Sequence, residues 1–142
     1  MKKFVAIALA MVLALALVAC GSSSIKDGTY TAEASEASYG YTTYLEVTYL
    51  DGKITDVDFD AVDANGTLKS SLGADYGMDP APDVWMPEIE ESIKNADGDA
   101  SKIEAVAGAT NSSNDAKLLF EAVLAAAKKG DTAVQKVDLP TE

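Results

Sequence analysis

Histidine is absent from this chain, and cysteine occurs once, at position 20. These two side chains are the usual ligands of structural zinc, haem and iron–sulfur clusters. They also supply the base of hydrolytic triads and the thiols of disulfide exchange. The composition therefore leaves all of these function classes without their usual residues, and redox chemistry would have to depend on a borrowed organic cofactor.

Positive charge is also scarce. The chain has 11 lysines and arginines against 23 aspartates and glutamates in 142 residues, a net charge of −12. Such a protein is repelled by nucleic acid and by anionic lipid headgroups. We therefore expect no nucleic-acid partner, and the length suits one small domain.

The longest apolar run lies at the N-terminus. Lys2 and Lys3 precede an apolar segment, residues 4–18, that is short for a membrane span and typical of a secretory signal peptide. Leu17-Val18-Ala19-Cys20 resembles a bacterial lipobox, in which the signal is cut before the cysteine and the sulfur is acylated. A plain signal peptide with a chance cysteine is the weaker alternative, because the only cysteine stands at the cleavage point.

Residues 1–19 are therefore expected to be a lipoprotein signal peptide, and residues 20–27 the lipidated Cys20 with a short tether. Two or more acyl chains on one residue give stable anchoring. Cleavage would leave 123 residues, and the loss of two lysines would take the net charge to −14.

A β-hairpin is predicted after a first strand at residues 27–34. Residues 41–50 and 53–60 are rich in β-formers and flank Asp51-Gly52, a hairpin signal. A two-residue turn would set Val47 beside Asp56. A turn with Gly52 as a bulge is predicted instead; its pairs are Tyr49 with Lys53, Val47 with Thr55, and Leu45 with Val57. It separates an apolar face (Leu45, Val47, Tyr49, Val57, Phe59) from an acidic face (Glu46, Asp56, Asp58).

Two main helices follow. One runs from Asp83 to about Lys94, with Pro87 in its first turn and Trp85 as a core or staple residue. The other begins at Ser112 or Ser113, because Ser112 and Asp115 form a capping-box pattern, and it ends at Gly130. Helical spacing places six of its residues in the core: Ala116, Leu119, Phe120, Val123, Ala126 and Ala127.

The predicted fold is a single α+β domain over residues 28–130, a twisted antiparallel sheet with the two helices packed on it. Residues 131–142 form either an edge strand or a loose tail.

The segment before the second helix contains a candidate anion-binding turn. Residues 102–106 are expected to be extended, and Gly108 allows a sharp turn beside the small Ala109. Thr110 would then sit just ahead of a helix N-terminus, whose free N–H groups and dipole favour an anion such as phosphate. Spacing alone is more typical of a well-capped strand-to-helix turn without a bound anion.

Gly108-Ala109-Thr110 followed by Ser112 resembles the flavinylation site of the FMN-binding domain family. That family includes the C subunit of sodium-pumping NADH:quinone reductase, the G subunit of the Rnf complex and small extracellular electron-transfer lipoproteins. The resemblance implies a phosphoester between FMN and Thr110, with Ser112 as the less favoured acceptor. The chain departs from the family pattern at Glu104, where Asp is usual, and at Ala107, where Ser or Thr is usual.

Residues 62–83 form a long glycine- and proline-rich stretch, which in a small domain is often functional. Small lipoproteins of the family show a similar lysine–serine and tyrosine–methionine pattern there. The resemblance implies that Tyr76 and Met78 wall the isoalloxazine ring and that Lys69 is a charge partner for flavin or phosphate. Ordinary loop packing and a solvated lysine are the alternative.

These expectations combine into a membrane-anchored electron carrier on the extracytoplasmic face of a bacterial membrane. A flavin transferase would attach FMN, and a quinone or dehydrogenase in the membrane would donate electrons. A carrier is favoured over an enzyme because no base or nucleophile is arranged for substrate chemistry. The alternatives are a cofactor-free surface lipoprotein that binds a ligand or partner, and a protein that binds FMN reversibly.

Overall fold

The computed structural model describes residues 24–140, so the predicted signal peptide and Cys20 lie outside the described residues. Eight elements follow along the chain: strands β1 (Gly28–Ala34), β2 (Tyr41–Leu50) and β3 (Lys53–Asp63), 3-10 helix η1 (Lys69–Tyr76), helix α2 (Pro82–Asn95), 3-10 helix η2 (Ala100–Lys102), helix α3 (Thr110–Lys129) and strand β4 (Gln135–Val137).

The four strands form one sheet in the order β3-β2-β1-β4. The first three are antiparallel, whereas β4 pairs in parallel with β1, with Gln135 opposite Ala32. The α+β class is confirmed, but the sheet is mixed rather than purely antiparallel. The chain returns through α3 before it forms β4, and such a crossover places the next strand parallel to its neighbour. Of the two predictions for the C-terminal segment, the structure has the edge strand.

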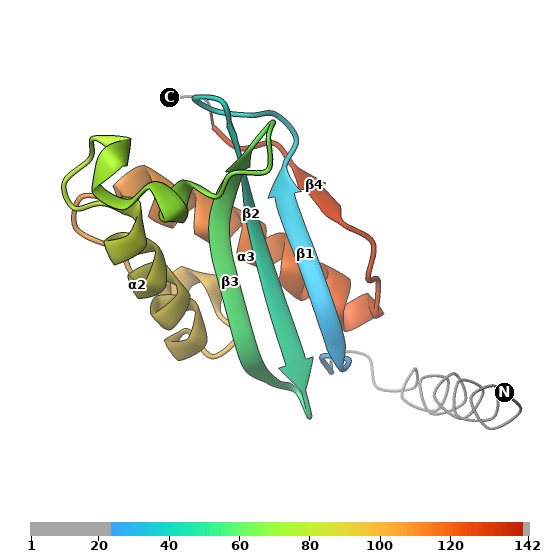
Figure 1. Cartoon of the computed structure of the whole chain (residues 1–142). Coiled ribbons are helices and arrows are strands. Elements are labelled where there is room, and N and C mark those ends of the chain that lie inside the picture. The colour runs from blue at the N-terminus through green and yellow to red at the C-terminus, as the bar shows by residue number, and fades with distance from the viewer. Residues whose placement is uncertain (1–23, 141–142) are drawn as a thin grey trace, which may run out of the picture.

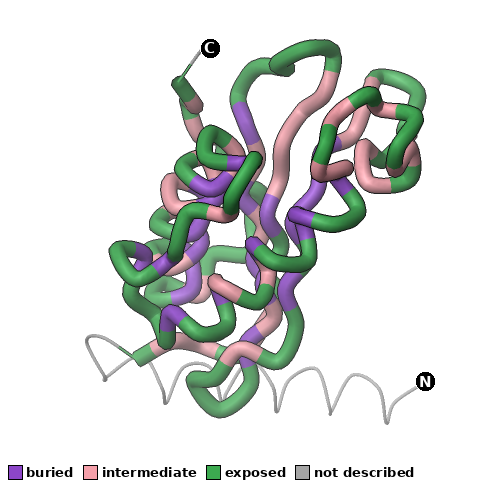
Figure 2. Tube along the Cα trace, turned by 90° about the vertical axis from the view of Figure 1, so that its left-hand side faces the viewer, coloured by how far each residue is buried: buried purple, intermediate pink, exposed green. Residues whose placement is uncertain are grey.

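Helices α2 and α3 cover the same face of the sheet (Figure 1), and the buried residues gather between the two layers (Figure 2). The largest fully buried side chains come from both layers and include Tyr30, Leu45, Phe59, Trp85, Ile89 and Phe120. All six predicted core residues of α3 are buried. The opposite face carries exposed carboxylates, including Glu46, Asp56 and Asp58.

The predicted hairpin register is wrong, although the predicted faces are right. Leu50 pairs with Lys53 across a two-residue turn in which Asp51 (φ 53°) and Gly52 (φ 75°) both have positive φ. The register then shifts between Thr48 and Tyr49. This bulge restores the apolar pairing further along the strands, so the hydrophobic face is kept by an irregularity inside the hairpin rather than at its turn.

Helix α3 begins at Thr110, with Ala109 as its N-cap and no side-chain cap hydrogen bond. The predicted start at Ser112 or Ser113 is therefore wrong. The buried Ser113 hydroxyl ties the turn together, since it donates to the Ala109 carbonyl and accepts from the Val106 N–H. That contact lets the helix start earlier than a capping box at Ser112 would allow.

Helix α2 also begins earlier than predicted. Pro82 occupies its first turn and Pro87 lies inside the helix. The segment predicted to be extended, residues 102–106, is confirmed in part, since Ile103 has an extended backbone with φ −68° and ψ 119°. Its first residue ends η2, and residues 103–106 join none of the four strands. The stretch after β3 is loop-like as predicted, apart from η1.

Candidate functional site

A cleft of about 910 Å³ opens where β2 begins, at the end of the sheet remote from the β2–β3 turn. Its walls come from η1, the first turn of α2, the turn that leads into α3, and the segments that follow β1 and β4. All seven residues predicted to form a cofactor site line it: Lys69, Tyr76, Met78, Gly108, Ala109, Thr110 and Ser112. Segments far apart in sequence are thus brought to one site, and their role toward a cofactor stays a prediction.

The turn into α3 is held by close packing and by buried hydrogen bonds. Gly108 has φ +83° and lies against the ring of Pro80. The Ala109 N–H donates to the Val106 carbonyl over 2.9 Å, and the Ser113 hydroxyl lies 2.7 Å from the Ala109 carbonyl oxygen. These contacts fix the backbone at the first turn of a 20-residue helix, where N–H groups have no partner within the helix.

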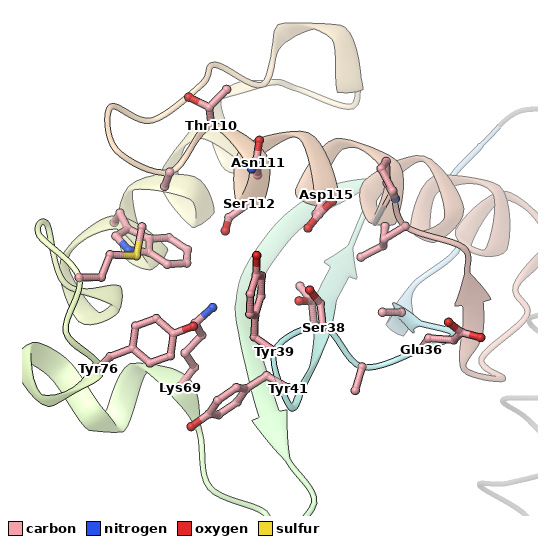
Figure 3. Close-up of a pocket in the computed structure, with 18 of the residues that line it drawn as sticks. Glu36, Ser38, Tyr39, Tyr41, Lys69, Tyr76, Thr110, Asn111, Ser112 and Asp115 are labelled. Carbon is pink, nitrogen blue, oxygen red and sulfur yellow. The ribbon is translucent and has the colours of Figure 1, made fainter. Parts of the chain in front are cut away.

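The two candidate hydroxyls take different positions on this turn. Thr110 is exposed at the rim of the cleft, and in Figure 3 its side chain points away from Lys69 and Tyr76. Ser112 is half-buried and points toward Tyr39, into the cleft. Thr110 is therefore the more accessible hydroxyl to a second protein, while Ser112 faces the interior of the site.

Aromatic rings surround Lys69, the only basic residue among the described residues that line the cleft. The Lys69 Nζ lies 4.5 Å from the ring centroid of Tyr76, 5.8 Å from that of Tyr41 and 5.9 Å from that of Trp85. Tyr41 and Tyr76 contact each other edge to face, with centroids 6.1 Å apart. An ammonium over aromatic faces is stabilised by the ring quadrupoles, so the rings keep this cation in the cleft.

A buried carboxylate anchors the residue next to Lys69. Asp60, 5% exposed, accepts hydrogen bonds from the N–H and the hydroxyl of Ser70 and from the Ala61 N–H. Asp60 belongs to β3, so these bonds attach the start of η1 to the sheet. The position of Lys69 is consequently set by the rigid part of the fold.

Sequence reasoning does not identify several residues of the site. It places Tyr41 in a strand, gives Tyr39 no role, and leaves the segment around Asp138 as an edge strand or a tail, yet all three residues line the cleft. It places Trp85 in the core; Trp85 is 1% exposed, and it also forms part of the cleft wall. The available signal is the cluster of tyrosines near residue 40, but their convergence with η1 depends on long-range packing.

The cleft suits a planar aromatic molecule with an anionic tail. Its volume lies within the usual range for small-molecule sites, roughly 300–1,000 Å³. It offers aromatic walls, one cation and a helix N-terminus. The Trp85 Nε1 atom is buried without a hydrogen-bond partner in the described part of the chain, an unused donor in the cleft wall. Residues 24–140 contain no group of three or more potential metal ligands.

Comparisons with known proteins agree with this chemistry. The FMN-binding domain family matches residues 39–125. A 15 kDa lipoprotein of Treponema pallidum (strain Nichols) is 33% identical over 129 residues, which are 86% of this chain and 90% of that lipoprotein. A crystal structure of a Clostridium perfringens protein superposes with a TM-score of 0.72 at 31% identity, and covers 82% of this chain and 99% of that one.

The family match spans more than half of the chain and includes most of the cleft. The chain therefore belongs to the FMN-binding domain family, and FMN is its cofactor.

Proposed function

We propose that this protein is a lipid-anchored flavoprotein on the extracytoplasmic face of a bacterial membrane, which carries FMN on Thr110 and shuttles electrons. The observation that carries the proposal is the position of Thr110, exposed at the first turn of α3 on the rim of an aromatic cleft. A flavin attached through its phosphate at the rim can place its ring within the cleft.

The anchor is inferred from the N-terminus and from a relative. Leu17-Val18-Ala19-Cys20 has the form of a lipobox, and the Treponema pallidum relative is named a lipoprotein. Within residues 24–140, no helix has the length and apolarity that a bilayer span needs. In this proposal, acyl chains on Cys20 attach the protein to the membrane.

The residues of the cleft have separate tasks. Tyr41, Tyr76 and Met78 bound the space for the ring, and the N–H groups at the start of α3 face the phosphate. When bound, FMN supplies a reversible redox couple that accepts electrons from a membrane quinone or dehydrogenase and passes them to an acceptor outside the cytoplasm. The aromatic walls exclude water from one side of that space.

Attachment requires an activated flavin. A direct ester between FMN and a hydroxyl would have to release water, so a flavin dinucleotide is the more suitable donor. The bond between Thr110 Oγ1 and the phosphorus forms, the phosphoanhydride bond to the leaving nucleotide breaks, and the hydroxyl proton passes to a base. A separate flavin transferase is expected to supply that base.

The charge balance favours a covalent link over reversible binding. The chain has a net charge of −12, and Glu36, Asp115 and Asp138 line the same cleft. This surface gives a free phosphate ester little electrostatic reason to stay. A bond to Thr110 would keep the cofactor despite the repulsion.

Intact mass spectrometry tests the proposal. The chain is produced with its signal peptide together with a flavin transferase, and the wild type is compared with Thr110→Ala, Ser112→Ala and Asn111→Ala. We expect an FMN increment on the wild type and on the Asn111 and Ser112 variants, and none on Thr110→Ala. Asn111→Ala is the matched control, because Asn111 lies on the same exposed turn and has no hydroxyl.

Other outcomes would contradict the proposal. An increment that survives Thr110→Ala but disappears in Ser112→Ala would transfer the attachment to Ser112. A yellow protein with no mass increment, which releases its flavin on denaturation, would establish reversible binding. A colourless protein under these conditions would favour the cofactor-free binding module, a reading that the family's FMN cofactor already opposes.

A further inference from the structure

We infer that Lys69 sets the reduction potential of the bound flavin, because its ammonium group is the positive charge that faces the ring when the ring becomes anionic. The inference deepens the proposed function. It rests on a flavin in the cleft, but it does not depend on a covalent bond to Thr110.

The Lys69 side chain forms no ion pair with a carboxylate of the described residues. Within residues 24–140 the one ion pair joins Lys136 to Glu33, far from Lys69 in the sequence. Lys69 is held instead by the faces of three aromatic rings, with Tyr76 nearest at 4.5 Å. Ring contacts stabilise an ammonium without neutralising it, so its charge remains available to a ligand.

Lys69 has no second basic residue beside it among the described residues of the cleft. Among the described residues that line it, Lys69 is the only basic one, and three carboxylates line the same space. An anion that enters the cleft therefore finds one favourable side chain. In a protein with a net charge of −12, an isolated cation at a site is a specific feature rather than part of a basic surface.

The position of Lys69 in the cleft determines which part of the flavin it would meet. FMN is anionic at its phosphate, and its ring becomes anionic on reduction. Figure 3 shows Lys69 across the cleft from Thr110 and Ser112, beside Tyr76 and Tyr41. If the phosphate lies at the start of α3, the ring extends toward Lys69 and its aromatic neighbours, so the ammonium acts on the ring.

The consequence for redox chemistry follows from charge balance. Two electrons from the membrane donor and one proton at N5 leave the ring with one negative charge, spread over N1 and the C2 carbonyl. A fixed ammonium stabilises this anion more than the neutral oxidised ring. Lys69 therefore raises the reduction potential.

The structure also holds Lys69 in place before the flavin is reduced. The neighbouring Ser70 is attached to the buried Asp60 by two hydrogen bonds. A charge that is fixed in advance needs no reorganisation when the ring charge develops, which increases its effect. Lys69 is thus a positioning and electrostatic residue for the cofactor rather than a proton donor.

The test compares midpoint potentials of the FMN-loaded wild type, Lys69→Met, Lys69→Arg and Lys53→Met, measured by spectroelectrochemistry. Loading uses the flavin transferase, or free FMN where intact mass shows no attachment. Lys69→Met keeps the length of the side chain and removes the charge. We expect it to weaken binding of the reduced relative to the oxidised flavin about tenfold, which lowers a two-electron potential by about 30 mV.

Two variants separate the local charge from other effects. Lys69→Arg retains the charge and should stay near the wild-type potential. Lys53→Met removes one charge at the β2–β3 turn, roughly 30 Å from the cleft along β2, and should leave the potential unchanged. Thermal unfolding of each variant checks that the fold is intact.

The outcomes distinguish the inference from the proposed function. A potential that is the same in Lys69→Met and the wild type, or that shifts equally in Lys53→Met, overturns the inference. Failure of FMN to load by either route overturns it too. The wild type could also show no mass increment while its midpoint potential still changes in Lys69→Met. That result would reject covalent attachment to Thr110 and support the role of Lys69.

Discussion

A Cβ atom placed on Gly108 would lie 2.6 Å from Cδ of Pro80, closer than real Cβ contacts occur. Gly108 also has φ +83°, a conformation that L-residues with side chains rarely adopt. The turn before Thr110 therefore requires glycine for two independent reasons. One is the backbone conformation, and the other is the proline packed against it.

Gly108→Ala is expected to destabilise the protein more than an ordinary glycine substitution. The left-handed conformation costs about 1–2 kcal/mol, and the contact with Pro80 adds an overpacking cost of about 1–3 kcal/mol. Gly66→Ala is the matched control, since Gly66 has φ +84° and a Cβ added there would meet nothing within 4 Å. Urea denaturation measures the loss of unfolding free energy in each variant. Equal losses would show that Pro80 shifts to accommodate the new methyl group without an energetic penalty.

The sequence was informative where one local rule decides the structure. Gly130 ends α3 in the left-handed conformation, as its place after a lysine pair predicts. The alternation in residues 41–60 predicted the buried face of the hairpin, because a pleated strand exposes every second side chain. Helical spacing predicted the buried residues of α3 for the same kind of reason.

Prediction failed where two local rules compete or where distant segments meet. Asp51-Gly52 is compatible with several turns, and the bulge that restores the register lies inside the strands at Thr48 and Tyr49. Two serines could cap α3, and the buried one, Ser113, bonds to the preceding turn instead. The motif pointed to Thr110 and its neighbours, but the contribution of Tyr39 to the cleft depends on tertiary packing that no local pattern encodes.

Ser70→Ala is expected to lower stability and loosen the start of η1. The hydroxyl of Ser70 donates to the buried carboxylate of Asp60, and loss of a hydrogen bond to a charged group costs about 1.5–3 kcal/mol. Ser71→Ala is the control, because the Ser71 hydroxyl donates to the Leu68 carbonyl at an exposed site. Thermal unfolding should show a drop of several degrees for Ser70→Ala and a smaller one for Ser71→Ala. Equal drops would mean that Asp60 is satisfied without Ser70.

Tyr30 and Tyr49 form a second matched pair. Their rings lie 6.2 Å apart and meet edge to face. The Tyr30 hydroxyl donates to the Lys26 carbonyl over 2.9 Å, and the Asp27 carbonyl is a second acceptor at 3.4 Å. The Tyr49 hydroxyl is buried without a partner in the described part of the chain, and burial raises the pKa of Tyr49 to about 12.

Tyr49→Phe should therefore be neutral or stabilising, by up to about 1 kcal/mol, because it removes an unsatisfied buried polar group. Tyr30→Phe should destabilise by about 0.5–1.5 kcal/mol, since it removes a hydrogen bond. Both changes retain the aromatic contact, so denaturant unfolding isolates the hydroxyl groups. Loss of stability in Tyr49→Phe would indicate that its hydroxyl has a partner, such as ordered water.

Glu90 links α2 to the edge strand β3 and should make stability depend on pH. Its Oε1 accepts a hydrogen bond of 2.9 Å from the Phe59 N–H. Burial is the main cause that raises the pKa of Glu90. Asp58 and Asp56 raise the pKa further, while the Phe59 bond and Lys94 act in the opposite direction. The folded protein therefore holds the Glu90 proton to a higher pH than the unfolded chain does.

The sign of the effect follows from proton linkage. The contribution of Glu90 to the free energy of unfolding is fully present below the pKa that glutamate has in the unfolded chain. It is lost as the pH rises through the raised pKa of Glu90 in the folded protein. Glu90→Gln keeps an oxygen acceptor for Phe59 and cannot ionise. It should unfold at a higher temperature than the wild type at pH 7, and the advantage should shrink as the pH falls into the acid range. Glu91→Gln removes the same charge from an exposed neighbour and controls for net charge, so an equal gain in both variants would assign the effect to overall repulsion instead.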